Sequence, residues 1–213
     1  MNLRRTAIAA LFGCALFANP ALAAIDASKL GASYDATNAN VTFKVYSGRA
    51  TRIELYLFST ATGTAEKSRV VMTLGTGGVW SATIPVTTLN GQGLTGTLYY
   101  GYRAWGPNWP YSTSWSKGSA TGFITDVDVN GNRFNPNKLL TDPYALELSH
   151  DPTTPTMTNG TIYASGALYR NIDTGSSAPK GIVLAGDTQS IGIKPTRALK
   201  DDVVYEVHVR GLT

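Results

Sequence analysis

The chain has few residues that could crosslink it or hold a metal. Its 213 residues include one cysteine, Cys14, and two histidines. A single thiol cannot form an intramolecular disulfide, and zinc sites need several Cys or His ligands at short spacing. Hydrophobic residues make up 43% of the sequence, and a chain of this length can bury most of its apolar surface. We therefore expect the core alone to stabilise the fold.

Charge is also scarce. Charged residues make up 15% of the sequence, and the formal net charge is +4. Two of the basic residues, Arg4 and Arg5, stand near the N-terminus, and the later lysines and arginines form no cluster. Nucleic-acid binding requires a basic patch or stripe. We therefore expect no nucleic-acid partner.

Long apolar runs are missing too. The apolar run at residues 7–18 is shorter than the roughly 20 residues that a helix needs to cross a bilayer. Ala21-Leu22-Ala23 follows it and places small residues where a signal peptidase cleaves. We interpret residues 1–23 as a signal peptide that is cleaved before Ala24. The protein is then expected to be secreted, to the periplasm or the exterior, with no membrane contact after cleavage.

Helical periodicity is hard to find after Ala24, whereas apolar and polar residues often alternate. A period of two in β-branched and aromatic residues indicates strands, and short strands separated by turn formers are typical of a sandwich. Strands are expected at residues 40–46, 52–58, 69–74, 79–84 and 97–105. The sequence therefore predicts an all-β, antiparallel β-sandwich in residues 24–123, from about Leu30 to Phe123.

Residues 124–200 are rich in Asn, Asp, Pro, Thr and Gly, and their apolar runs are short. A structureless loop of this length is unusual in a compact domain. One alternative is a flexible linker. We prefer an extended connecting segment that lies along a neighbouring domain, because it keeps aromatic residues such as Phe134, Tyr144 and Tyr163. The sandwich should then be stable without this segment.

Residues 201–213 have the pattern of a strong strand. Val203, Tyr205, Val207 and Val209 share one face of it. An apolar strand face needs partners, and strands buried on both faces are typical of parallel sheets and barrels. We expect this strand to be the first of a second domain whose remainder is not in the sequence.

Three tryptophans stand close together, one at the end of the last expected sandwich strand and two in the turn-rich stretch that follows it. Aromatic rings stack on the apolar faces of sugars, so Trp105, Trp109 and Trp115 are candidate carbohydrate-binding residues. The alternative is that the three rings cover one end of the core, as aromatic residues more often do. Trp80, inside an expected strand, is expected to be a core residue.

Catalytic and metal motifs are not convincing. Asp142, Glu147 and Asp151 lie near one another in sequence, but no nucleophile elbow or zinc-protease motif occurs. Residues 126–131 resemble the start of a calcium loop, yet the twelfth position is Asn137, where such a loop needs a bidentate Glu. We expect an Asx turn there instead.

Three stretches, residues 99–107, 132–145 and 204–211, together resemble the isoamylase family of secreted starch- and glycogen-debranching enzymes. The resemblance implies an immunoglobulin-like β-sandwich of the glycogen-binding type as N-terminal module. It also implies that the last strand begins a truncated (β/α)8 barrel, and that the catalytic residues lie beyond Thr213. The parent reaction would be hydrolysis of α-1,6-glucosidic branch points with retention, so this chain alone should be inactive.

The resemblance also implies partners and a metal. The partners would be α-glucans, such as glycogen and amylopectin, and the enzyme's own barrel domain. Asp151 matches one ligand of the family's calcium site, whose other ligands lie beyond Thr213, so this chain is not expected to hold Ca²⁺ by itself. The alternative to an enzyme fragment is a stand-alone secreted α-glucan-binding module without enzymatic activity.

Overall fold

The computed structural model describes residues 30–152, 160–164 and 166–185. The expected signal peptide at residues 1–23 and the expected barrel strand at residues 201–213 lie outside the described residues. Within the described ranges, no helix is long and apolar enough to span a membrane.

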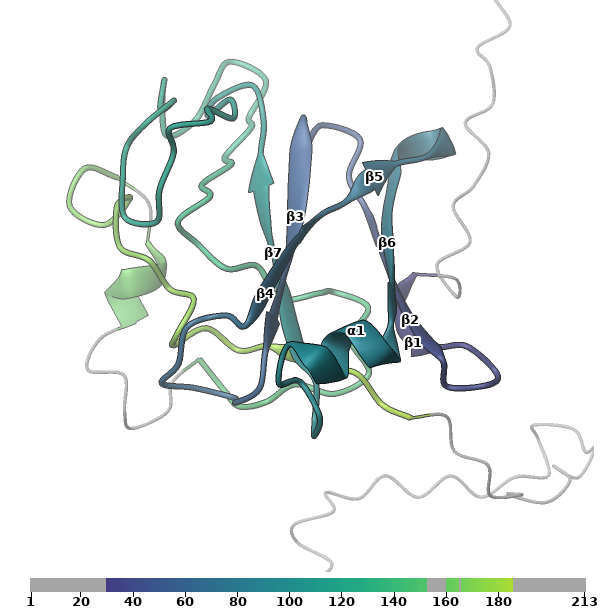
Figure 1. Cartoon of the computed structure of the whole chain (residues 1–213). Helices are drawn as coiled ribbons and strands as arrows, with labels where there is room; N and C mark the ends of the chain where they lie inside the picture. Colours follow the sequence, from purple (N-terminus) through teal and green to yellow (C-terminus); the bar gives the residue numbers. More distant parts are fainter. Residues whose placement is uncertain (1–29, 153–159, 165, 186–213) are drawn as a thin grey trace, which may run out of the picture.

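Two antiparallel sheets of four strands face each other (Figure 1). The strand order is β1-β2-β6-β5 in sheet A and β4-β3-β7-β8 in sheet B. The elements are β1 (Gly31–Tyr34), β2 (Asn40–Tyr46), β3 (Arg52–Phe58), β4 (Ser68–Val71), β5 (Thr73–Leu74), β6 (Val79–Pro85), α1 (Val86–Gly91), β7 (Tyr99–Trp105) and β8 (Gly181–Ile182), with 3-10 turns at Thr76–Gly78 and Gly160–Tyr163. The predicted antiparallel β-sandwich is confirmed.

Alternation of side chains explains the inner core. In β2, Val41, Phe43 and Val45 are buried while the residues between them are partly exposed. β2 pairs with β6 along its whole length, from Asn40 opposite Pro85 to Tyr46 opposite Val79. Because successive side chains of a strand point to opposite faces, this pattern sends every second residue between the sheets.

The expected strand at residues 69–74 is two strands in the structure. β4 pairs with β3 in sheet B, whereas β5 pairs with β6 in sheet A. Met72, which is 3% exposed, lies between them in the core. The chain changes sheets at this residue, a corner that an uninterrupted apolar pattern does not reveal.

The middle strands of sheet B are buried on both faces. In β3 the residues from Ile53 to Phe58 are all buried, and in β7 so are those from Tyr100 to Trp105. The outward face includes charged residues, Glu54 and Arg103, each 0% exposed. An antiparallel sheet often leaves one face in water. Because the outward face of sheet B is buried instead, another part of the chain must cover it.

The cover is the segment that follows β7. It lies on the side of sheet B away from sheet A (Figure 1), where Leu139 and Ala178 pack with Tyr56 and Phe58. Arg103 donates hydrogen bonds from the sheet to the Pro136 carbonyl at 2.7 Å and to the Asp173 carboxylate at 2.5 Å. The charges of this face are buried with partners: Arg103 has them in the covering segment, and Glu54 has them in sheet B itself, in Arg52 and Tyr56.

The sandwich therefore continues beyond Phe123, where the sequence analysis ended it. β8 pairs with β7, with Ile182 opposite Tyr99, and Leu140 forms a bridge with Tyr102. Val183 belongs to the inner core. The described part of the segment lies on this sandwich, whereas we expected from the sequence that it would lie along a neighbouring domain. The segment's one strand among the described residues, β8, is too short to show a period of two, so the sequence pattern of the segment resembles that of a linker.

Candidate functional site

The three candidate tryptophans are buried. Trp105 is 0%, Trp109 1% and Trp115 9% exposed. Trp105 and Trp115 meet edge to face with ring centroids 5.1 Å apart, and Trp109 meets Phe123 in the same way at 5.0 Å. The rings pack on each other and on the covering segment, as in the core alternative. None of them offers a free face to a sugar in this structure.

Tyr111, which lies just after Trp109 in the stretch that follows β7, is a more exposed aromatic residue, with 37% of its surface exposed. The Arg52 guanidinium lies over it at 3.9 Å, and its edge contacts Trp105. One face of Tyr111 is therefore already occupied by a cation. Trp80 is 5% exposed, so its predicted place in the core is confirmed.

The buried carboxylates of the described residues are Glu54 and Asp142, and both are committed to structural contacts. Glu54 accepts hydrogen bonds from Arg52 Nε at 2.7 Å and from Tyr56 Oη at 3.1 Å. Asp142 accepts from Tyr100 Oη at 2.8 Å and Tyr102 Oη at 3.2 Å. Glu147 and Asp151 are exposed. The three carboxylates that are near one another in sequence are thus divided between the core, where Asp142 lies, and the surface, where Glu147 and Asp151 lie.

Asp142 and burial act together on the two core tyrosines. Burial raises the pKa of Tyr100 and of Tyr102, and the charge of Asp142 raises both further. Both hydroxyls therefore stay protonated and act as donors at neutral pH. This arrangement explains why residues 141–145 join the sandwich. Among the described residues, it leaves neither buried carboxylate, Glu54 or Asp142, available for acid–base chemistry.

The calcium-like stretch forms the expected Asx turn. Asp128 Oδ1 accepts the backbone N–H groups of Asn130 and Asn132, each at 2.9 Å. Asp126 instead pairs with Arg170 at 2.6 Å. The two carboxylates that a calcium loop would share are thus used separately.

Asp151 does not form a calcium site with the described residues. It is exposed, and the described ranges contain no group of three His, Cys, Asp or Glu side chains placed to hold a metal. Calcium takes six to eight oxygen ligands. One surface carboxylate does not satisfy that need, so the described residues do not by themselves fit the metal.

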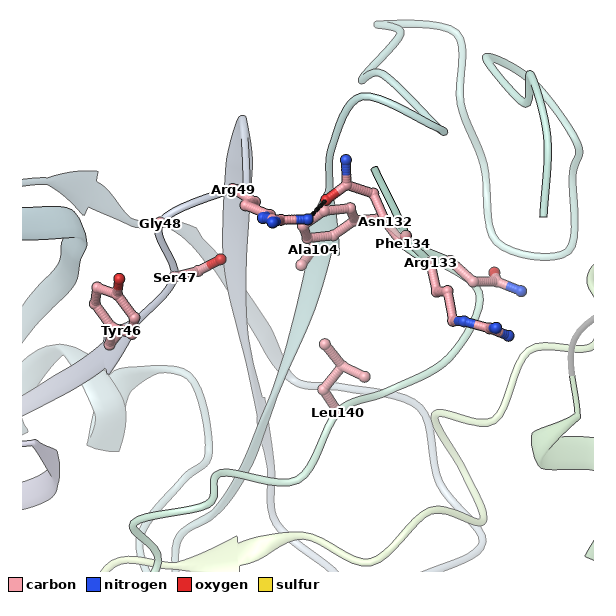
Figure 2. Close-up of a pocket in the computed structure, with 11 residues that line it drawn as sticks. Tyr46, Ser47, Gly48, Arg49, Ala104, Asn132, Arg133, Phe134 and Leu140 are labelled. Atoms are coloured by element: carbon pink, nitrogen blue, oxygen red, sulfur yellow. Dashed lines mark hydrogen bonds between the residues drawn. The ribbon is translucent and has the colours of Figure 1, made fainter. Parts of the chain in front are cut away.

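An open pocket of about 690 Å³ lies at one end of the sandwich (Figure 2). Residues 46–49, at and just after the end of β2, form one wall, and residues 131–135 form the other. Ala104 and Leu140 also line it. Binding pockets for small ligands typically span about 300–1,000 Å³, so the pocket is large enough for one.

Glycines position Tyr46 at one end of this pocket. A Cβ built on Gly78 would lie 2.9 Å from Tyr46 Cε2, and one built on Gly48 would lie 2.9 Å from its Oη. The ring therefore rests directly on glycine backbone. It is still 45% exposed, so part of the ring is open to a ligand.

Two arginines line the pocket, and they differ in their hydrogen bonds to the described residues. Arg49 donates to the Asn130 carbonyl at 2.6 Å and to Asn132 Oδ1 at 3.3 Å, a contact drawn in Figure 2. Hydrogen bonds from Asn132, together with the nearby Arg49 charge, lower the pKa of Asp128. Arg133 is exposed and has no hydrogen bond or ion pair with any described residue.

Sequence reasoning did not select this pocket. Tyr46 ends a strand, and Arg133 and Phe134 lie in a stretch noted for its family resemblance and, in the case of Phe134, for its aromatic side chain. The pocket brings together residues more than eighty positions apart. The one signal near Tyr46 in the sequence is Gly48, which, together with the distant Gly78, allows the close approach of backbone to the Tyr46 ring.

Comparison with known proteins finds that the chain is similar to isoamylases and to a glycogen debranching enzyme. An isoamylase of Pseudomonas amyloderamosa is 59% identical over 210 residues, 97% of this chain and 27% of that enzyme. A Flavobacterium isoamylase is 61% identical over 214 residues, 100% of this chain and 27% of that enzyme. A glycogen debranching enzyme of Erwinia tasmaniensis is 33% identical over 185 residues, covering 86% and 23%.

The chain thus spans about a quarter of the length of these relatives. Within it, residues 29–145 match a family of carbohydrate-associated domains, and this range holds seven of the eight strands and both walls of the pocket. The match covers more than half of the chain. The chain belongs to the family of carbohydrate-binding module 48, the isoamylase N-terminal domain.

Proposed function

We propose that this chain is the N-terminal part of an isoamylase-type debranching enzyme, and that its sandwich associates with the α-glucan substrate. The observation that carries the proposal is the family match over residues 29–145. The isoamylases with about 60% identity over nearly the whole chain support the same conclusion. A carbohydrate-binding module acts by holding a polysaccharide near a catalytic domain, which raises the local substrate concentration.

The parent enzyme would hydrolyse α-1,6-glucosidic branch points of glycogen and amylopectin. The anomeric configuration would be retained, because one carboxylate forms a covalent glycosyl-enzyme intermediate and a second carboxyl group acts as general acid and then general base. The described carboxylates support an inactive module, because Glu54 and Asp142 are both held by tyrosines or arginines in the sandwich. In this proposal the reacting carboxylates belong to the barrel, the parent's own partner domain, and the whole enzyme is exported.

Two measurements on the purified chain test the proposal. The chain should sediment with insoluble amylopectin or be retarded by glycogen in a native gel. It should release no reducing sugar from either glucan, whereas the full-length gene product should do so and shorten the branches. Saturable debranching by the chain alone would contradict the assignment of catalysis to the barrel, and failure to bind either glucan would contradict the module's role.

A further inference from the structure

We propose that the pocket between residues 46–49 and 131–135 is an α-glucan subsite, with Tyr46 stacking on one glucose unit and Arg133 hydrogen-bonding the hydroxyls of another. The inference rests on the proposed function, because it names where the module meets its polysaccharide. It also moves the binding site away from the three tryptophans, which are buried.

The stacking end of the subsite is the Tyr46 ring. Sugar rings present apolar C–H groups on their faces, and aromatic side chains bind them by stacking. A stacking platform works best when it is fixed before the ligand arrives. Tyr46 meets that condition because its ring rests on the backbone of Gly48 and Gly78 while the side chain stays 45% exposed.

The hydrogen-bonding end is Arg133. Figure 2 shows Tyr46 and Arg133 at opposite ends of the pocket, with Leu140 between them. The Arg133 guanidinium has no partner among the described residues, so its planar set of donors is available for adjacent hydroxyls. Because the two residues stand apart, a ligand that uses both must extend over more than one ring.

The charge of the pocket favours a neutral ligand. Its lining contains no Asp or Glu, and Arg49 is already held by Asn130 and Asn132. Asp128 accepts from Asn132 and lies close to Arg49, so that cation is locally compensated. A single arginine without a partner among the described residues, with an aromatic ring at the other end of the pocket, suits a polyol with many hydroxyls better than a polyanion.

The lining between the two ends is partly apolar. Leu140 is 45% exposed in spite of its size, and Phe134 and Ala104 lie beside it in the lining. Carbohydrate sites combine such apolar surface with a few directed polar groups. The pocket has this combination.

Affinity measurements with maltoheptaose on the purified chain test the subsite. Tyr46→Ala should weaken binding about fivefold through loss of stacking, whereas Tyr46→Phe should retain most of the affinity. Arg133→Ala should weaken it by a similar, roughly fivefold factor, and the double variant by roughly the product of the two. Glucose should bind more weakly than maltoheptaose, because one ring cannot occupy both ends.

Tyr111→Ala is the matched control, since Tyr111 is a similarly exposed tyrosine outside the pocket lining. It should bind maltoheptaose like the unaltered chain. Thermal unfolding midpoints of the pocket variants should stay within about 2 °C of the parent, as expected for surface substitutions.

The outcomes separate the two proposals. If the unaltered chain binds and the Tyr46 and Arg133 variants bind equally well, the pocket is not the subsite but the α-glucan association stands. If Tyr111→Ala loses affinity as Tyr46→Ala does, the site lies elsewhere and the inference is overturned. If the unaltered chain does not bind any α-glucan, both proposals are overturned together.

Discussion

Asp142 shows how one buried charge can organise several neighbours. Its carboxylate accepts hydrogen bonds from Tyr100 and Tyr102 in β7 and from the backbone N–H of Tyr144 at 2.9 Å. It therefore fastens residues 141–145 to sheet B. A buried carboxylate of this kind is stable because each of its partners donates to it.

Removing this carboxylate should be costly. Asp142→Ala would leave two buried hydroxyls and one N–H without their acceptor, so we expect a loss of about 3 kcal/mol in the free energy of unfolding. Urea denaturation would measure it. Asp142→Asn should recover part of the loss, and Glu147→Ala, at an exposed position, should change stability by less than about 0.5 kcal/mol. A stable Asp142→Ala variant would contradict the role given to this residue.

Gly106 is another position where one atom decides the packing. A Cβ there would lie 2.1 Å from Phe134 Cδ2, so the Phe134 ring would have to move. We expect Gly106→Ala to destabilise the protein by about 1–3 kcal/mol, as overpacking does. Gly96→Ala is the control, since nothing lies within 4 Å of a Cβ at that position. Equal thermal midpoints for the two variants would show that the ring adjusts freely.

The role of the three tryptophans could not be predicted from the sequence. An aromatic cluster in a turn-rich stretch has the same sequence pattern whether its rings bind a sugar or cover a core. Only the burial of Trp105 and Trp109, at 0% and 1% exposure, distinguishes the two. Tyr46 has no such cluster beside it in the sequence, because Gly78 and the facing pocket wall at residues 131–135 are distant from it, and only Gly48 is near.

Among the elements, β2, β3 and β6 were predictable because apolar and more polar residues largely alternate along them, and β7 because it is rich in aromatic residues. β8 was not, because it has only two residues and owes its conformation to pairing with β7. The helix α1 was missed for a similar reason, being six residues long and rich in Thr. Tertiary contacts rather than local propensity define these short elements.

The turn between β1 and β2 is predicted to respond to acid. Asp35 accepts hydrogen bonds from Asn40 Nδ2 at 2.8 Å and from the backbone N–H groups of Thr37 and Ala39. These bonds, led by that from Asn40, lower the pKa of Asp35 to about 2. Because the folded pKa is depressed, the carboxylate's contribution is complete above its unfolded pKa of about 4 and is lost as the pH falls towards 2.

Amide NMR shifts of Thr37 and Ala39, followed from pH 5 downwards, would measure this titration. The transition should have its midpoint near pH 2, and Asp35→Asn should abolish it. A midpoint near pH 4, the ordinary value for an aspartate, would show that the turn does not hold the ionised form.

For the whole molecule, the covering segment is predicted to be essential. A chain that ends at Phe123 would lose Leu139, Asp142 and Val183, which belong to its buried surfaces, and would expose the outer face of sheet B. We expect this truncation to aggregate or lack cooperative unfolding, whereas a chain ending at Ala185 should unfold cooperatively. This reverses the expectation from sequence that the sandwich is stable alone, and a soluble, cooperative chain ending at Phe123 would restore it.

The pairing of β7 with β8 has a consequence for how the protein acquires its structure. The partner of Tyr99 is Ile182, so sheet B receives its last strand about eighty residues after β7 has left the ribosome. Until then the β7 edge and the charges beside it face water. Contacts this distant in sequence slow folding, although the entropic cost of closing a longer loop grows only with the logarithm of its length. The final step of assembly is therefore expected to be the arrival of the covering segment rather than the pairing of the central strands.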